Sequence, residues 1–275
     1  MRPNGVITLT TDFGLADSYV GAMKGVILSI AAEARLIDIT HDVGPQDTHQ
    51  AAYMVQTFCS YFPIGTIHLV VVDPGVGSRR RAIAFSTPEA IFLAPDNGVL
   101  TYAWRDALAQ WGPEACEVVE LAEPRFWLPQ VSSTFHGRDI FAPVAAHLAR
   151  GVSLSSLGPR LARLTEADLE QPTGGRTGGL DGRIIHVDHF GNCITNITPG
   201  HLEQAGLDER LTIRIIDQQI SGLHRTFADV PVGALIALIG SNNRLELAVR
   251  NGNAAQSLGV GIGDTVRVRP GHEEE

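Results

Sequence analysis

The chain has 275 residues, of which 44% are hydrophobic and 19% charged, and its formal net charge is −9. This composition indicates a globular protein with a sizeable core, and the lack of a long basic run disfavours nucleic acid as a partner. Three cysteines without C-x-x-C spacing argue against a disulfide framework or a zinc site and fit a reducing compartment, so we expect a cytoplasmic protein. The N-terminus shows no apolar signal segment, and no stretch approaches the ~18 apolar residues of a membrane span, so we expect neither a signal peptide nor a membrane partner.

Strands and helices are expected to alternate over residues 1–164. A buried strand is expected at 6–12, further strands at 36–40, 66–73, 81–86 and 90–95, and helices at 18–33, 48–60 and 138–149. Asp17 or Ser18 is expected to cap the first helix. The alternation predicts an α/β N-terminal domain, in which a mostly parallel sheet carries helices on both faces.

The character of the sequence changes after residue 164. Residues 165–180 are polar and rich in glycine, which predicts a linker. In the remaining residues, 181–275, short alternating runs predict strands at 182–188, 211–216, 234–239, 245–249 and 265–269. Short strands with turn signals between them predict a smaller, all-β C-terminal domain, a barrel or a sandwich.

Three of the expected N-terminal strands end in acidic or amide-rich turns. These turns contain Asp12, Asp73 and the pair Asp96–Asn97, and a fourth polar segment contains His136. Open α/β sheets bind ligands outside the carboxyl ends of their strands, so we expect these turns to converge on one site. The pattern favours an enzyme for a small polar substrate, with a nucleoside preferred.

Each of these residues also has a purely structural interpretation. Asp12 and Asp17 either hold ribose hydroxyls or close a turn and cap a helix. The segment that starts at Asp73 is glycine-rich but lacks the P-loop pattern, and of its three arginines Arg80 is expected to pair with Asp73 and keep it ionised. His136 is either structural or catalytic.

The second domain offers two further polar turns. Phe190 and Asn192 follow Asp188, and they either recognise a purine by stacking and edge contacts or form an ordinary turn with a buried ring. Ser241 lies in a turn that is either a hairpin loop or a nest of backbone amides for a carboxylate.

Six motifs, taken in order along the chain, resemble those of the S-adenosyl-L-methionine (SAM) hydroxide adenosyltransferases, which are relatives of the bacterial fluorinase and chlorinase. The motifs are TDFG at 11–14, DPGVG at 73–77, PDNG at 95–98, FHGRD at 135–139, FGN at 190–192 and GSN at 240–242. The resemblance implies an α/β N-terminal domain and a C-terminal β-barrel. It also implies a homotrimer whose active sites lie between the N-terminal domain of one subunit and the C-terminal domain of the next. The implied reaction converts SAM and water to adenosine and L-methionine, without a metal or another cofactor.

The resemblance also implies roles for individual residues. Asp73, Arg80 and His136 would act together on the nucleophilic water. The halogenase relatives carry Tyr at the positions of Asp73 and His136. They also have an inserted loop where this chain runs directly from residue 86 to 95. In these features the chain resembles the hydrolases. The expected substrate contacts are Asp12 and Asp17 for the ribose, Phe190 and Asn192 for adenine, Asp188 and Ser241 near the methionine end, Gly137 and Val249 along the pocket, and Gln46 in the approximate place of a fluorinase Trp.

Three rival functions stay open at this point. A halogenase of the same fold is disfavoured because the Asp73 carboxylate would repel a halide. A non-catalytic protein that binds adenosine is the second rival. The third is a metal-dependent phosphoesterase with an oxygen-rich site. Its ligands would be drawn from Asp12, Asp17, Asp73, Asp96, Asn97 and His136.

Overall fold

The computed structural model describes residues 1–174 and 178–271, which form two compact units, Met1–Asp168 and Leu169–Glu275. Residues 175–177 of the expected linker and 272–275 of the expected C-terminal domain lie outside the described residues. Each unit has a hydrophobic core of its own. The two units are therefore described one at a time.

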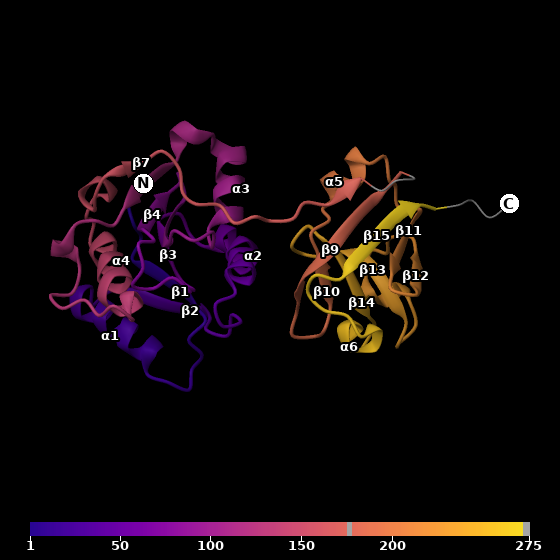
Figure 1. The fold of residues 1–275 in the computed structure, drawn as a ribbon, viewed down its shortest axis with the longest axis horizontal. Coiled ribbons are helices and arrows are strands. Elements are labelled where there is room, and N and C mark those ends of the chain that lie inside the picture. Colours follow the sequence, from indigo (N-terminus) through magenta and orange to yellow (C-terminus); the bar gives the residue numbers. More distant parts are fainter. Residues whose placement is uncertain (175–177, 272–275) are drawn as a thin grey trace. The chain divides into compact units, whose positions relative to one another are not determined.

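A seven-stranded mixed sheet forms the centre of the N-terminal unit, in the order β2-β1-β3-β5-β4-β6-β7 (Figure 1). The strands are β1 (Val6–Thr11), β2 (Arg35–Thr40), β3 (Thr66–Val71), β4 (Ala82–Ser86), β5 (Ala90–Pro95), β6 (Glu117–Glu120) and β7 (Arg160–Leu161). The pairs among β2, β1, β3 and β5 are parallel, whereas β4 pairs antiparallel with β5 and β6. The expected mostly parallel sheet is confirmed, and its parallel half carries the turns after β1 and β3.

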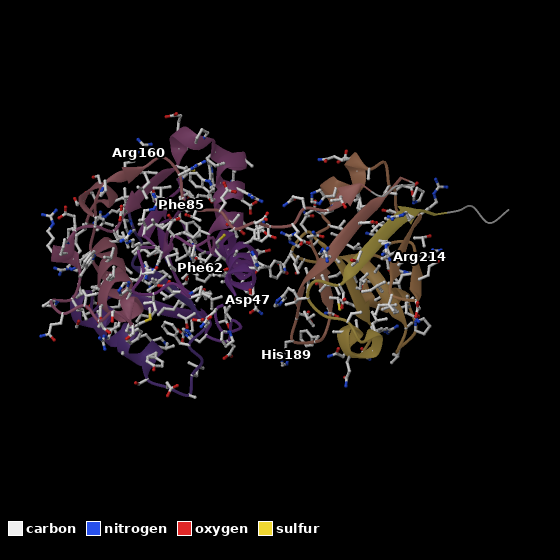
Figure 2. The ribbon with its side chains drawn as sticks, in the orientation of Figure 1. Asp47, Phe62, Phe85, Arg160, His189 and Arg214 are labelled. Carbon is white, nitrogen blue, oxygen red and sulfur yellow. The ribbon has the colours of Figure 1, made fainter. Side chains whose placement is uncertain are left out.

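Helices cover both faces of this sheet, as the sequence predicts. The α-helices are α1 (Tyr19–Ile30), α2 (Thr48–Phe58), α3 (Thr101–Trp111) and α4 (Ala142–Ala149), and the short helical turns are η1 (Cys59–Tyr61), η2 (Pro113–Ala115), η3 (Pro124–Phe126), η4 (Gly137–Phe141) and η5 (Leu154–Ser156). β3 shows why two layers form, because its buried side chains alternate between the two faces. Leu69 packs in the core under α1 and α4, whereas Val70 packs in the core under α2 and α3. Phe85 of β4 lies in the second core (Figure 2).

Two details of the expected helices are wrong. Ser18 occupies the cap position of α1 but makes no capping bond with its side chain, and Asp17 is exposed, so neither residue caps the helix as predicted. Helix α3 was not predicted at all. Its buried residues are Thr101, Ala103, Trp104 and Ala107.

The C-terminal unit is an antiparallel sheet that curls into a nearly closed barrel, in the order β12-β11-β15-β9-β10-β14-β13. Its strands are β8 (Thr173–Gly174), β9 (Leu180–Val187), β10 (Cys193–Thr195), β11 (Leu211–Ile215), β12 (Gln218–Ser221), β13 (Leu235–Ile239), β14 (Leu245–Val249) and β15 (Thr265–Pro270), with helices α5 (Pro199–Gln204), η6 (Phe227–Asp229) and α6 (Ala254–Leu258). His224, just after β12, forms a bridge with Leu238 of β13, which brings the two end strands together. Ile213 of β11 is buried inside, while Arg214 points outward (Figure 2).

None of the helices in the described ranges combines the length and the apolar character that crossing a bilayer requires.

Candidate active site

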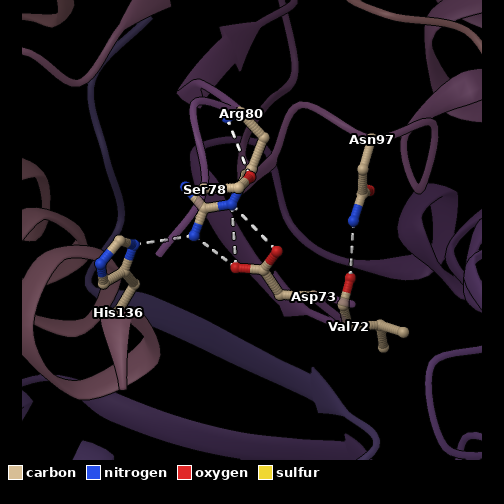
Figure 3. Close-up of polar contacts among 6 residues, drawn as sticks. All are labelled: Val72, Asp73, Ser78, Arg80, Asn97 and His136. Carbon is tan, nitrogen blue, oxygen red and sulfur yellow. Dashed lines mark hydrogen bonds and ion pairs between the residues drawn. The ribbon is translucent and has the colours of Figure 1, made fainter. Parts of the chain in front are cut away.

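Asp73, Arg80 and His136 form one hydrogen-bonded cluster beyond the carboxyl end of β3 (Figure 3). The Arg80 guanidinium donates from Nε to both carboxylate oxygens of Asp73, at 2.9 and 3.0 Å, and from Nη2 to Oδ2. The same Nη2 lies 2.9 Å from Nδ1 of His136. The side chains of Asp73 and Arg80 are only 5% and 10% exposed, so this ion pair is largely removed from water. The expected pairing of Arg80 with Asp73 is therefore present.

The contact with Arg80 fixes the protonation pattern of His136. A guanidinium only donates hydrogen bonds, so Nδ1 must accept and the proton of the neutral ring lies on Nε2. The pKa of His136 is lowered, first by burial and then by the positive charge of Arg80, against smaller opposing effects of Asp73 and Asp139. His136 is thus held as a neutral imidazole that carries its proton on Nε2.

Backbone geometry brings the loops of this cluster together. Gly77 has a φ of +75°, and a Cβ at this position would lie 2.3 Å from the carbonyl oxygen of Ser133. Only glycine allows the loop after Asp73 to approach the loop before His136 so closely. The end of β3 is held from the other side, because the Asn97 side chain donates to the Val72 carbonyl at 2.9 Å (Figure 3).

The cluster opens into a cavity of about 550 Å³, which Asp12, Gln46 and Gly137 also line. The carboxylate of Asp12 accepts a 2.8 Å hydrogen bond from the backbone N–H of Gln46. Gln46 itself has a left-handed backbone with a φ of 64°. Of the N-terminal site candidates, Asp12, Gln46, Asp73, His136 and Gly137 line this cavity, and Arg80 is bonded to two of them. Asp17 is exposed and is not among the described residues that line it.

The same cavity has an aromatic wall that the sequence analysis missed. The rings of Phe13, Tyr19 and Phe135 meet edge to face, with centroids 5.2 to 5.9 Å apart. All three residues line the cavity. Tyr19 lies in the helix expected at 18–33, five residues after the TDFG motif, and this nearness to the motif offered a signal. Edge-to-face aromatic groups give a rigid apolar surface on which a flat or sulfur-bearing ligand can pack.

The third polar turn, Asp96–Asn97, has a structural role in place of the expected convergence on the site. Asp96 pairs with Arg81 and also accepts the backbone N–H of Thr165 at 2.6 Å. Its side chain is 2% exposed. Asn97 supports the end of β3, as described above. This turn supports the site from outside the cavity, since neither Asp96 nor Asn97 is among the described residues that line it.

The C-terminal candidates Asp188, Phe190 and Asn192 share the loop between β9 and β10. Asp188 Oδ1 accepts the backbone N–H groups of Phe190 and Asn192 at 2.9 and 2.8 Å, while Oδ2 accepts from the Asn192 side chain at 2.8 Å. This bonding leaves the Phe190 ring 72% exposed, so the expectation of a buried ring in an ordinary turn is wrong. An exposed aromatic ring on a rigid loop is available for stacking.

The remaining C-terminal candidates lie on the hairpin formed by β13 and β14. Ser241 is exposed in the turn, and Val249 packs at the edge of the barrel core. Glu246 of β14 was not predicted as part of this group. Its pKa is raised by burial and then by the nearby Asp188 carboxylate, so it is a further acidic group beside the FGN loop.

The metal-site alternative finds no support in the arrangement of its proposed ligands. Asp73 is committed to Arg80, Asp96 to Arg81, and the Asn97 amide to a backbone carbonyl. Over residues 1–174 and 178–271, no three His, Cys, Asp or Glu side chains gather in a way that would hold a metal ion.

Known proteins and family models match this chain over nearly its whole length. The family models described as SAM hydroxide adenosyltransferase N-terminal and C-terminal domains match residues 7–158 and 182–267. A protein of Salinispora arenicola named (R)-S-adenosyl-L-methionine hydrolase is 41% identical, over 96% of this chain and 98% of its own. A protein of the same name from Thermus thermophilus is 38% identical, over 98% and 100%. A fluorinase of Nocardia brasiliensis is 28% identical, over 97% of each chain.

Solved structures agree with these matches. An uncharacterized conserved protein from Thermotoga maritima is 36% identical, has a TM-score of 0.86, and covers 96% of this chain and 100% of its own. The fold expected from the six motifs is thereby confirmed. The chain belongs to the SAM hydroxide adenosyltransferase family.

Proposed function

We propose that this protein is a hydrolase that converts SAM and water to adenosine and L-methionine. The observation that carries the proposal is the Asp73–Arg80–His136 cluster at the wall of a cavity, in a chain 41% identical along its length to a SAM hydrolase. The water oxygen forms a bond to C5′ of the ribose as the C5′–sulfur bond breaks. The bonding electrons go to sulfur, which leaves as the neutral thioether of methionine, and the water loses one proton.

The cluster supplies the two functions that this reaction needs from the protein. His136 donates from Nε2–H to the water oxygen and fixes its position, because Arg80 occupies Nδ1. The Asp73 carboxylate accepts the proton that the water releases. Alignment of the water, C5′ and sulfur can supply roughly 7–11 kcal/mol, and a positioned base typically adds ~10²–10⁴-fold. A metal is not required by this chemistry, since the sulfonium already activates the carbon.

Substrate recognition is proposed to use residues of both units. Asp12 would bind the ribose hydroxyls, with its orientation supported by the Gln46 N–H. Phe190 would stack on adenine, and Asn192 would contact its edge. The family resemblance favours a homotrimer in which the two units come from neighbouring subunits. Light scattering of the purified protein tests this assembly.

Halide transfer is the alternative reaction within the family. Two like unit charges 4 Å apart repel by about 4 kcal/mol at an effective dielectric constant of 20, so the Asp73 carboxylate disfavours a halide. Arg80 offsets part of this repulsion. Hydrolysis is therefore proposed, and chloride is included in the test.

The test is incubation of the purified protein with SAM and EDTA, with and without chloride, followed by chromatography of the products. Adenosine and methionine, in amounts that neither chelator nor chloride changes, are expected. A chlorinated nucleoside would identify a halogenase. Adenosine that disappears with EDTA would identify a metal enzyme, and tight adenosine binding without turnover would identify a binding protein.

A further inference from the structure

His41 lies beside the turn that carries Asp12 and contacts that turn at both ends. Its Nδ1 lies 2.8 Å from the hydroxyl of Thr11, and its backbone carbonyl accepts the N–H of Gly14 at 2.7 Å. The Thr11 hydroxyl also accepts the N–H of Phe13 at 3.2 Å. Thr11 and His41 therefore fix the beginning, the middle and the end of the TDFG turn.

Both side chains are removed from water and from the active-site cavity. Thr11 is 0% exposed and His41 is 4% exposed. Neither is among the described residues that line the cavity, whereas Asp12 and Phe13, which lie in the turn, both line it. Thr11 and His41 can therefore act on a ligand only through the turn that they hold.

Asp38 determines which nitrogen of His41 carries the proton. Nε2 of His41 lies 3.0 Å from Oδ1 of Asp38, and Nζ of Lys24 lies 2.6 Å from Oδ2. Burial raises the pKa of Asp38, but the hydrogen bonds and charges of Lys24 and His41 outweigh burial and lower it, so Asp38 is an ionised carboxylate that only accepts. The proton of the neutral His41 ring then lies on Nε2, and Nδ1 accepts from the Thr11 hydroxyl.

Strand β1 contains a second pair of this kind. The hydroxyl of Thr8 lies 2.9 Å from Nδ1 of His68, and both residues are 0% exposed. Thr8 lies three residues before Thr11, and neither Thr8 nor His68 is among the described residues that line the active-site cavity. The Thr8–His68 pair thus has the same chemistry and burial without a turn of the site attached to it.

We propose that Thr11 and His41 are positioning residues for ribose recognition, with Asp38 fixing the tautomer through which they act. They hold the TDFG turn so that the Asp12 carboxylate faces the ribose hydroxyls, and the N–H of Gln46 supports the same carboxylate directly. The inference rests on the proposed function, since it takes Asp12 as the ribose-binding residue. It goes further by assigning part of the ribose affinity to two buried residues that touch no ligand.

The test compares the binding of adenosine and of 2′,3′-dideoxyadenosine, which lacks the ribose hydroxyls, by calorimetry on the full-length protein. The wild-type protein should prefer adenosine by roughly tenfold or more, because the hydroxyls bond to a charged carboxylate. Thr11→Val keeps the shape of the side chain but removes its hydroxyl. This change should reduce the preference roughly fivefold and leave the affinity for dideoxyadenosine unchanged. Thr11→Ser, which keeps the hydroxyl, should retain the wild-type preference.

Thr8→Val is the matched control, because it removes a hydroxyl from the equivalent pair. It should lower the free energy of unfolding as much as Thr11→Val does, yet leave the preference for adenosine unchanged. His41→Leu should reduce the preference as Thr11→Val does, and the double variant should lose no more than either single variant, since the two side chains act through one bond. Asp38→Ala should reduce the preference at least twofold. The Asp38 side chain is 39% exposed, so this variant keeps the test decisive if Thr11→Val does not fold.

Three results would overturn the proposal. The first is an unchanged preference for adenosine in the folded variants among Thr11→Val, His41→Leu and Asp38→Ala. The second is an equal loss of preference in Thr8→Val, which would show a general effect of destabilising β1. The third is a wild-type protein that binds both ligands equally, because Asp12 would then not bind the ribose. The comparison needs no turnover, so a failure of SAM hydrolysis would contradict the proposed function and leave this test intact.

Discussion

Replacing Asp73 by Asn tests the proposed catalytic cluster most directly. The change keeps the size of the side chain but removes the charge that Arg80 faces. Both side chains are largely buried, and Arg80 donates to both oxygens of the carboxylate. Removing one partner of such a pair costs about 3–5 kcal/mol, and we expect a value near the lower limit because Asn retains one acceptor oxygen. Loss of the proton acceptor should lower the rate by ~10²–10⁴-fold.

Two measurements separate these effects. Adenosine formation is followed at a temperature where the variant is folded, and the free energy of unfolding is obtained from urea titration. Asp217→Asn, an exposed change between β11 and β12, serves as the control and should alter neither quantity. A free energy of unfolding lowered by about 3 kcal/mol, together with a wild-type rate of adenosine formation, would show that Asp73 only holds Arg80. That result would refute the assignment of Asp73 as the proton acceptor. Unchanged stability would refute the reasoning about the buried pair.

Three further predictions follow from the geometry. Because the pKa of His136 is lowered and its neutral form accepts from Arg80, kcat/KM should be constant above pH 6.5 and fall only at a lower pH; an acid limb above 6.5 in the pH–rate profile would contradict this. The Nδ1 atom of His41 lies 2.8 Å from the Thr11 hydroxyl, beside the Asp12 turn. The change His41→Leu should destabilise the protein by about 1–3 kcal/mol and raise KM for SAM more than it lowers kcat. Steady-state kinetics that show a fall in kcat alone would disagree. In urea titration, Gly77→Ala should lower the free energy of unfolding by roughly 1–3 kcal/mol more than Gly112→Ala. Gly112 has the same φ of +75°, but a Cβ there would meet open space. Equal losses would argue against close contact between the loop after Asp73 and the loop before His136.

Much of the fold follows from the sequence because its strands are strongly marked. The fully buried β3 was predicted from its β-branched run, and its position in turn placed Asp73 at a strand end. Helix α3 was not predicted, although Trp104 and two alanines on its inward face are buried.

The site was less predictable because its contacts are made through space. Asp73 and Asp96 both follow strands and resemble each other in sequence, yet Asp96 is used by Arg81 and the Thr165 backbone, a contact across 69 residues. The aromatic wall, which includes Tyr19 and Phe135, forms only when α1 meets the loop before η4. Local patterns carry no information about such distant partners.

The Asp73–Arg80–His136 cluster is held together by hydrogen bonds among its own side chains. Its charges and dipoles are oriented during folding, so little reorganisation of the protein is left for the moment of reaction. The chemical step should then depend weakly on large movements of this unit. If turnover proves slow, loop opening or adenosine release would be the first candidate for the rate-limiting step. Such movements limit the rate of many enzymes whose catalytic groups are preorganised.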